Sequence, residues 1–189
     1  MASAVEAGVD WVQLRERDLG GAEILALADA VVVAARRAAA QRGARVRILV
    51  NRRVDVALAV GADGVHLGFD AVDPETARGL LGPDALVGVS THSTDEVRRA
   101  GARGASYVHL APIFPPLSKA PSRPPLGAAG LAGAAAGSVP VLAQGGVDAG
   151  NAAEVVAAGA AGVAVTGAIL LADDPAAATT ALRRALDGR

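Results

Sequence analysis

Two arginines lie close together near the start of the sequence, at the end of a short apolar segment. Gln13, Arg15 and Arg17 occupy every second position there. Alternate side chains of an extended strand point to the same side, so these three polar groups are expected to share one face. Paired guanidinium groups are well suited to binding a phosphate or another anion. Ion pairs with Glu16 or Asp18 are the alternative, and the sequence leaves both interpretations open.

Three further polar residues directly follow apolar segments. Asn51 follows one segment, and Ser90 and His92 follow another. A histidine at the mouth of a site can move a proton near neutral pH. Equally, Asn51 could cap a helix and His92 could be a hydrogen-bonded structural residue. The other two histidines, His66 and His109, lie in the middle of apolar segments, and we expect them to pack in the interior rather than bind a metal.

Small residues follow the last two apolar segments of the chain. Gly145-Gly146 follows one of them and Thr166-Gly167 follows the other. Loops without large side chains let the oxygens of a ligand approach backbone N–H groups, and a helix N-terminus adds favourable charge. We therefore predict phosphate binding at these two loops.

The elements that position these residues alternate between strand and helix. A glycine followed by apolar residues recurs before short β-branched segments. This pattern predicts the end of a helix followed by the start of a strand. Seven strands are expected, at 11–15, 46–50, 64–68, 86–90, 106–111, 139–144 and 162–166. Alternation of this kind predicts a parallel sheet, and a closed (β/α) barrel has eight strands. We predict a single TIM-type barrel domain over residues 1–189 that lacks the first strand.

Helix signals support this order of elements. Apolar residues mark one face of a helix over 21–41, and an alanine-rich stretch predicts another over 128–136. Asp73-Pro74 and Asp174-Pro175 are typical helix starts, and Ser93 with Glu96 fits a capping box. In contrast, residues 111–126 hold six of the ten prolines and show no period, which indicates a long functional loop.

Composition excludes several classes of protein. The 189 residues carry a net charge of −1, so we expect no nucleic-acid partner and no binding to an anionic membrane. There is no cysteine, which excludes disulfides and thiol chemistry. No signal peptide is visible, and no apolar stretch approaches the roughly 20 residues needed to span a bilayer. We expect a cytoplasmic enzyme that acts on a small phosphorylated metabolite.

Seven motifs, in order, make the sequence resemble the thiamine phosphate synthase family, which includes a thiazole tautomerase. They are residues 12–17 (VQLRER), 51–55 (NRRVD), 64–68 (GVHLG), 88–93 (GVSTHS), 111–119 (APIFPPLSK), 145–146 (GG) and 165–169 (VTGAI). The resemblance covers nearly the whole chain. It implies a (β/α) barrel and a transferase that joins hydroxymethylpyrimidine diphosphate to thiazole phosphate and releases diphosphate.

The resemblance also implies a role for each site residue. Gln13 would contact the pyrimidine, and Ser118 and the loops at Gly145-Gly146 and Thr166-Gly167 would hold the thiazole phosphate. The diphosphate would be surrounded by Arg15, Arg17, Asn51, Ser90 and Lys119. The residues expected to be catalytic are His92, Ser90, Arg15, Arg17 and Lys119.

The sequence departs from the family pattern where the family holds Mg²⁺. Arg52 and Ala71 stand where the family has aspartate ligands, and Asp70 is the carboxylate left beside them. Other departures are Arg17 for a lysine, Phe69 for a glutamine and Pro116 for a threonine. Mg²⁺ binding is therefore doubtful, and we expect diphosphate binding to survive chelation of divalent ions.

Three functions remain open at this point. The first is coupling of the phosphorylated pyrimidine and thiazole substrates. The second is tautomerisation of a thiazole carboxylate phosphate with His92 as acid and base, since the tautomerase also has an Arg-Glu-Arg segment and lacks the metal aspartates. The third is binding of thiamine-pathway phosphates without catalysis. Coupling ranks first because Gln13 and the long loop match the synthase, and a homodimer is left open.

Overall fold

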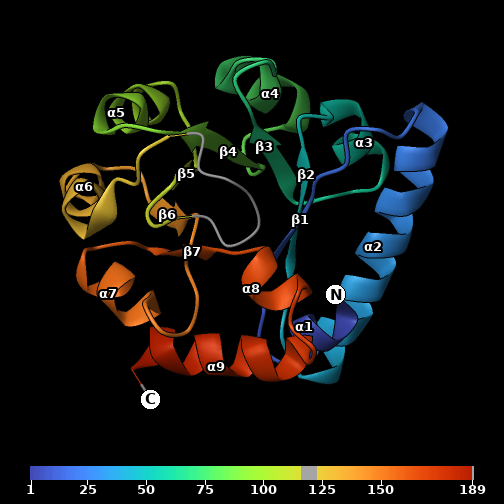
Figure 1. Cartoon of the computed structure of the whole chain (residues 1–189). Coiled ribbons are helices and arrows are strands. Elements are labelled where there is room, and N and C mark those ends of the chain that lie inside the picture. Colours follow the sequence, from blue (N-terminus) through green and yellow to red (C-terminus); the bar gives the residue numbers. More distant parts are fainter. Residues whose placement is uncertain (116–122, 189) are drawn as a thin grey trace. The chain divides into compact units, whose positions relative to one another are not determined.

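Helices and strands alternate along the chain in a computed structural model that describes residues 1–115 and 123–188 (Figure 1). The chain divides into two compact units, Met1–Gly88 and Val89–Arg189, which we call the N-terminal and C-terminal units. Seven strands occur within the described residues, and the bounds of each lie within two residues of the expected ones. The predicted number and placement of strands are confirmed.

The N-terminal unit is a run of parallel strands and helices. Its elements are α1 (Ala2–Glu6), β1 (Trp11–Leu14), α2 (Gly21–Gln41), β2 (Arg47–Asn51), α3 (Val54–Ala59), β3 (Gly64–Leu67) and α4 (Pro74–Leu81). Strand β1 pairs with β2 and β2 with β3, both in parallel. Helix α1 packs on α2 (Figure 1). The long helix predicted over 21–41 is confirmed, and Trp11, at the start of β1, is 37% exposed.

Strand β4 (Leu86–Thr91) contains the boundary between the units. At its start, the N–H of Leu86 donates to the carbonyl of Asp63 at 2.9 Å, within the N-terminal unit. At its end, the carbonyl of Thr91 accepts from the N–H of Ala111 at 3.1 Å, within the C-terminal unit.

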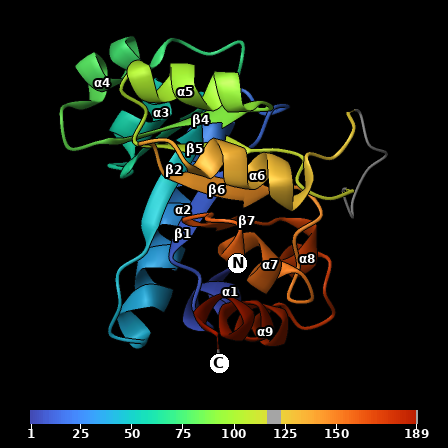
Figure 2. The same cartoon turned by 90° about the vertical axis from the view of Figure 1, so that its left-hand side faces the viewer.

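The C-terminal unit continues the alternation. Its elements are α5 (Thr94–Ala102), β5 (Tyr107–Leu110), α6 (Gly127–Ala135), β6 (Val141–Gln144), α7 (Ala152–Ala157), β7 (Gly162–Ala164), α8 (Gly167–Leu170) and α9 (Pro175–Asp187). Strands β5, β6 and β7 pair in parallel in that order. Helix α5 lies beside α6, and α9 packs against α7 and α8 (Figure 2).

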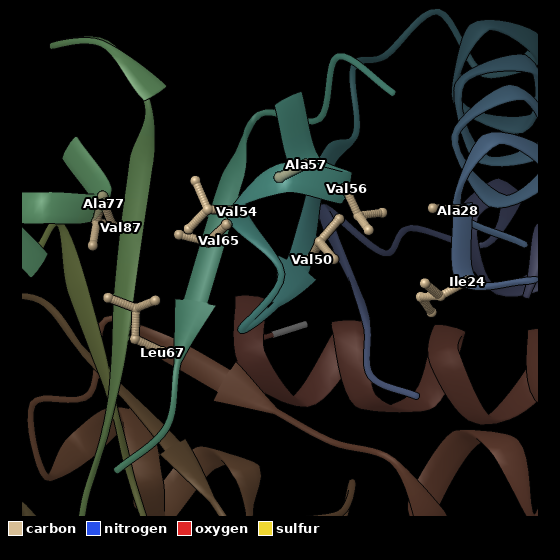
Figure 3. Close-up of a cluster of buried hydrophobic side chains, with 10 residues drawn as sticks. All are labelled: Ile24, Ala28, Val50, Val54, Val56, Ala57, Val65, Leu67, Ala77 and Val87. Carbon is tan, nitrogen blue, oxygen red and sulfur yellow. The ribbon is translucent and has the colours of Figure 1, made fainter. Parts of the chain in front are cut away.

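Small aliphatic side chains fill the core of the N-terminal unit, as the composition predicts. One cluster joins α2, β2, α3, β3, α4 and β4 (Figure 3). Its buried members are Ile24, Ala28, Val50, Val54, Val56, Ala57, Val65, Leu67, Ala77 and Val87. Such short side chains let helices lie close to a parallel sheet that is buried on both faces. This packing fixes the strand ends from which the candidate site residues emerge.

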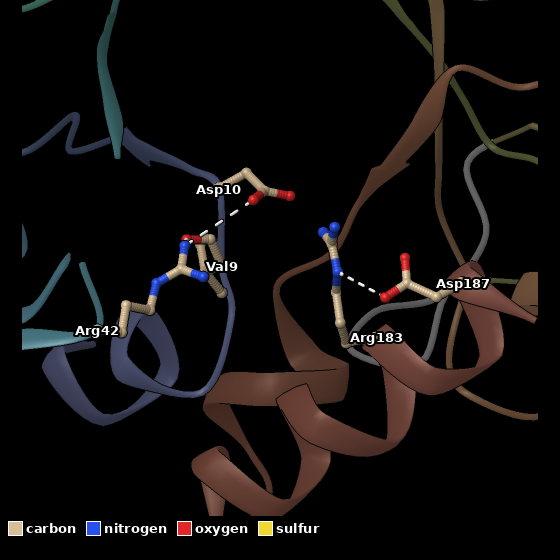
Figure 4. Close-up of polar contacts among 5 residues, drawn as sticks. All are labelled: Val9, Asp10, Arg42, Arg183 and Asp187. Carbon is tan, nitrogen blue, oxygen red and sulfur yellow. Dashed lines mark hydrogen bonds and ion pairs between the residues drawn. The ribbon is translucent and has the colours of Figure 1, made fainter. Parts of the chain in front are cut away.

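Polar side chains secure the ends of several helices. The carboxylate of Asp73 accepts from the N–H of Thr76, and that of Asp174 accepts from Ala176 and Ala177, so both predicted helix starts are confirmed. After α2, Arg42 donates to the carbonyl of Val9 at 3.0 Å (Figure 4).

Ion pairs supplement these caps. The guanidinium of Arg42 also lies 3.9 Å from the Asp10 carboxylate, in the N-terminal unit (Figure 4). In the C-terminal unit, Arg183 and Asp187 of α9 form a pair at 3.3 Å, four residues apart. Pairs as exposed as these contribute little to stability, about 1 kcal/mol at most.

Candidate functional site

The carboxyl ends of β1, β2 and β3 are neighbours in the N-terminal unit. Leu14 pairs with Val50, and Asn51 pairs with His66. Paired strands lie about 4.8 Å apart, so the residues that follow β1 and β2 emerge side by side. These residues include Arg15 and Arg52. The register therefore brings together the chain segments that the sequence had suggested for anion binding.

Arg52 has an unusual backbone. Its φ of 66° is the only positive value among the non-glycine residues that the structure describes. Its N–H donates to the carbonyl of His66 at 2.9 Å, and its Nη1 lies 2.7 Å from Oδ2 of Asp70. A left-handed backbone costs a residue with a Cβ about 1–2 kcal/mol. The ion pair returns about 1 kcal/mol at most, because the two side chains are 34% and 64% exposed. Stability alone does not explain this residue, and strain of this kind clusters at functional sites.

The next residue, Arg53, forms a two-pronged ion pair within its own segment. Its Nε and Nη2 donate to the two carboxylate oxygens of Asp55 at 2.8 and 2.6 Å. These hydrogen bonds lower the pKa of Asp55 from 3.8 to about 2. Arg53 therefore has a structural partner that accounts for its charge.

Arg15 and Arg17 are exposed and form no ion pair with any residue in the described ranges. Glu16, one of the partners that the alternative offered, instead accepts from the backbone N–H groups of Arg17 and Asp18 at 2.7 and 3.3 Å. These two hydrogen bonds lower the pKa of the Glu16 carboxyl. Both guanidinium groups are thus left for a ligand as far as the described residues are concerned. We call Arg15, Arg17 and Arg52 the arginine cluster.

Gln13 and Asn51 are half-buried beside the arginine cluster. The Nε2 of Gln13 is buried and has no hydrogen-bond partner in the described part of the chain, so it is a donor available to a ligand. Asn51 donates from Nδ2 to the carbonyl of His66 at 3.2 Å. Its helix-cap interpretation is wrong, because the residue that precedes α3 as N-cap is Arg53.

The donors in this unit do not fit a magnesium site. Mg²⁺ requires near-octahedral oxygen coordination. Within residues 1–115 and 123–188 no group of three or more His, Cys, Asp or Glu side chains could hold a metal ion. Asp70, the carboxylate that follows β3, is paired with the guanidinium of Arg52.

In the C-terminal unit, His92 follows β4 and lies against Glu96 one helical turn later. The N–H of His92 donates to Oε2 of Glu96 at 2.6 Å, and the ring Nδ1 lies 3.6 Å from the same oxygen. Ser93 caps α5 by accepting from the N–H of Glu96. The predicted capping box is therefore half right, because the Glu96 carboxylate binds His92 rather than the cap residue. The spacing of four residues between His92 and Glu96 is the sequence feature that could have predicted this contact. Ser90 is half-buried in β4.

The loop after β6 is built on close backbone contacts. Gly145 and Gly146 have φ values of 88° and 65°. A Cβ on Gly146 would lie 2.4 Å from the carbonyl oxygen of Pro115, and one on Gly145 would lie 2.9 Å from Pro112. Asn151 adds a hydrogen bond to the carbonyl of Gly146 at 2.8 Å. The packing of this loop therefore requires both glycines, whether or not a phosphate binds there.

Thr166-Gly167 lies where the sequence placed it, between β7 and α8. Thr166 precedes α8, and Gly167 is the first residue of that helix. Because α8 has only four residues, few peptide dipoles are aligned in it. Any phosphate bound here would depend on individual N–H groups rather than on a helix dipole. Two other predicted site residues, Ser118 and Lys119, lie outside the described residues.

The two mid-strand histidines are buried, as predicted. His66 is 1% exposed and His109 is 7% exposed. Burial lowers the pKa of His109 from 6.5 to about 4, although a hydrogen bond with Gln144 opposes the shift. The neighbouring Tyr107, whose ring centroid lies 5.5 Å from that of His109, has its pKa raised by burial. These residues are part of the packed interior.

Parallel strands alternating with helices, with polar groups following the strands' carboxyl ends, are the hallmark of (β/α)-barrel enzymes. A solved thiamine phosphate pyrophosphorylase from Pyrococcus furiosus has a similar structure, with a TM-score of 0.84 and 31% sequence identity. The match covers 99% of this chain and 87% of that one. The predicted fold class is thereby confirmed.

Sequence comparison narrows this class to one family. The family described as thiamine monophosphate synthase matches residues 1–169. A thiamine-phosphate synthase of Roseiflexus sp. strain RS-1 is 41% identical over 96% of this chain and 75% of its own length. The thiamine-phosphate synthase of Anaeromyxobacter dehalogenans is 45% identical over 98% of this chain and 81% of its own length. The chain belongs to the thiamine monophosphate synthase family. None of the helices in the described ranges combines the length and apolar composition needed to traverse a bilayer.

Proposed function

We propose that this protein couples hydroxymethylpyrimidine diphosphate to thiazole phosphate, forming thiamine phosphate and releasing diphosphate. The observation that carries the proposal is the family match, with relatives named as thiamine-phosphate synthases that are 41–45% identical over nearly the whole chain. Nothing in these comparisons favours the tautomerase alternative.

The reaction replaces one bond at the pyrimidine methylene carbon. The C–O bond to the diphosphate breaks, and its electron pair leaves with the diphosphate. The thiazole nitrogen then supplies the pair for the new C–N bond. Positive charge placed beside the leaving group stabilises the negative charge that develops there.

The N-terminal unit offers groups suited to the pyrimidine diphosphate. The unpartnered Nε2 of Gln13 can donate to a pyrimidine nitrogen. The arginine cluster can contact phosphate oxygens, because guanidinium groups form two parallel N–H···O bonds with them. Asn51, held by the carbonyl of His66, is assigned to the same substrate. These groups would bind the diphosphate without Mg²⁺, because the described donors do not fit a magnesium site.

The C-terminal unit is assigned to the remaining interactions. The N–H groups of Gly145-Gly146 and Thr166-Gly167 would bind the thiazole phosphate, together with Ser118. Ser90 and Lys119 are assigned to the diphosphate. His92, whose ring lies against the Glu96 carboxylate, would donate or accept a proton during the reaction.

The direct test is product formation. The purified protein is mixed with both substrates, in chelator and in Mg²⁺, and thiamine phosphate is measured by chromatography. We expect product under at least one condition, and strong loss of product in Arg15→Ala. Arg53→Ala removes the same charge from a residue paired with Asp55 and is the matched control. No product under either condition would refute the proposal.

A further inference from the structure

We propose that Arg52 is a diphosphate-binding residue of the N-terminal unit, and that diphosphate binds there without a divalent metal ion. The identity of the ligand rests on the proposed function. Two features of Arg52 point to this role: its strained backbone and its ion pair with Asp70.

The guanidinium of Arg52 lies against a single carboxylate. Its Nη1 is 2.7 Å from Oδ2 of Asp70, and the guanidinium donates no hydrogen bond to any residue that the structure describes. At the neighbouring Arg53, by contrast, both Nε and Nη2 are bound to Asp55. Two adjacent arginines thus differ: a carboxylate already takes two parallel N–H groups of Arg53, whereas no described residue accepts a hydrogen bond from the guanidinium of Arg52.

Arg52 and Arg15 occupy equivalent positions at the ends of neighbouring strands. Arg52 directly follows Asn51 at the end of β2, and Arg15 directly follows Leu14 at the end of β1, which pairs with β2. The left-handed backbone at Arg52 turns the chain immediately after the strand, where Asp70 then orients the side chain. A strained, half-exposed arginine beside two unpaired arginines indicates an anion site.

The same geometry opposes a metal ion. A cation approaching the Asp70 carboxylate would have to displace or face the guanidinium that is already 2.7 Å away. Both are positive, so they compete for the same oxygen. The guanidinium thus supplies the positive charge that a metal ion would otherwise bring to the diphosphate.

The experiment is calorimetric titration of the full-length protein with inorganic pyrophosphate in EDTA. We expect the wild type to bind. Arg52→Ala should weaken binding roughly 10- to 100-fold, the size expected for loss of a charged hydrogen-bond pair. Arg52→Gly should weaken it equally, and this variant keeps the left-handed backbone without strain, so a loss cannot be attributed to misfolding.

Arg53→Ala and Asp70→Asn complete the design. Arg53→Ala removes an adjacent charge and should change the affinity less than about threefold, because that guanidinium is already engaged. Asp70→Asn should weaken binding in EDTA less than Arg52→Gly does, because Asp70 orients the guanidinium but does not itself bind the anion. If Asp70 were a metal ligand instead, added Mg²⁺ would strengthen pyrophosphate binding in the wild type and not in Asp70→Asn. Equal losses in Arg52→Gly and Arg53→Ala would overturn the inference in favour of non-specific attraction.

The inference and the proposed function can fail separately. If the wild type binds pyrophosphate only when Mg²⁺ is added, yet forms thiamine phosphate, the function stands and the inference is wrong. If pyrophosphate binds in EDTA and is lost in Arg52→Gly, but no thiamine phosphate forms, the inference stands and the function is wrong.

Discussion

Arg52 and Gly146 have nearly the same backbone conformation for opposite reasons. Their φ values are 66° and 65°, and both residues closely follow a strand, one in each unit. At Gly146 a Cβ would meet the carbonyl of Pro115 at 2.4 Å, so space forbids a side chain. At Arg52 a long side chain is kept although glycine would suit the backbone better. A left-handed residue can therefore mark tight packing in one place and a retained functional group in another.

The comparison predicts its largest effect at Gly146. Gly146→Ala should lower the free energy of unfolding by about 3 kcal/mol, since strain and overpacking add. Urea denaturation of both proteins measures this. Gly104→Ala is the control in the same unit, because Gly104 has a φ of 80° but open space around its Cβ, and it should cost only about 1 kcal/mol. Equal losses of stability at the two positions would mean that close packing adds nothing to the backbone strain at Gly146. A bulky residue at Gly146 is therefore unsuitable for testing phosphate binding.

The second largest effect is expected at low pH, where a buried histidine should make the protein less stable. His109 has a folded pKa of about 4, below its ordinary 6.5, because burial disfavours the charged ring. The unfolded chain binds the proton more readily, so the free energy of unfolding should fall as the pH drops from 6.5 towards 4. We expect about 2–3 kcal/mol from this group between pH 7.5 and 4.5. His109→Gln should flatten the profile by that amount, and an unchanged profile would contradict the assignment.

The smallest effect is expected at Arg52 and has the opposite sign. Arg52→Gly should raise the free energy of unfolding by about 1 kcal/mol, because it removes the strain and loses only an exposed ion pair. Thermal or urea unfolding in the absence of ligand measures the change. A clear loss of stability would mean that the Arg52–Asp70 pair holds the fold together, and Arg52 would then resemble Gly146 after all.

Local patterns predicted most of the fold. Strand positions, the long helix and the starts at Asp73 and Asp174 followed from periodicity and from caps that involve only neighbouring residues. The site was less accessible to prediction. The left-handed backbone of Arg52 and its contact with Asp70 depend on the pairing of β2 with β3, which single residues do not encode. The Glu96 carboxylate had two partners in reach, and the sequence favoured the wrong one. A homodimer and a cytoplasmic location stay predictions.

The distribution of aromatic residues gives this protein two built-in optical probes. Its single tryptophan, Trp11, is partly exposed at the start of β1, and its single tyrosine, Tyr107, is buried in β5. Fluorescence excited at a wavelength that tryptophan alone absorbs therefore reports on the N-terminal unit, and the tyrosine signal reports on the C-terminal unit. Coincident denaturation curves from the two signals are a standard criterion of all-or-none unfolding. The cooperativity of the two units can thus be followed without adding a label to either.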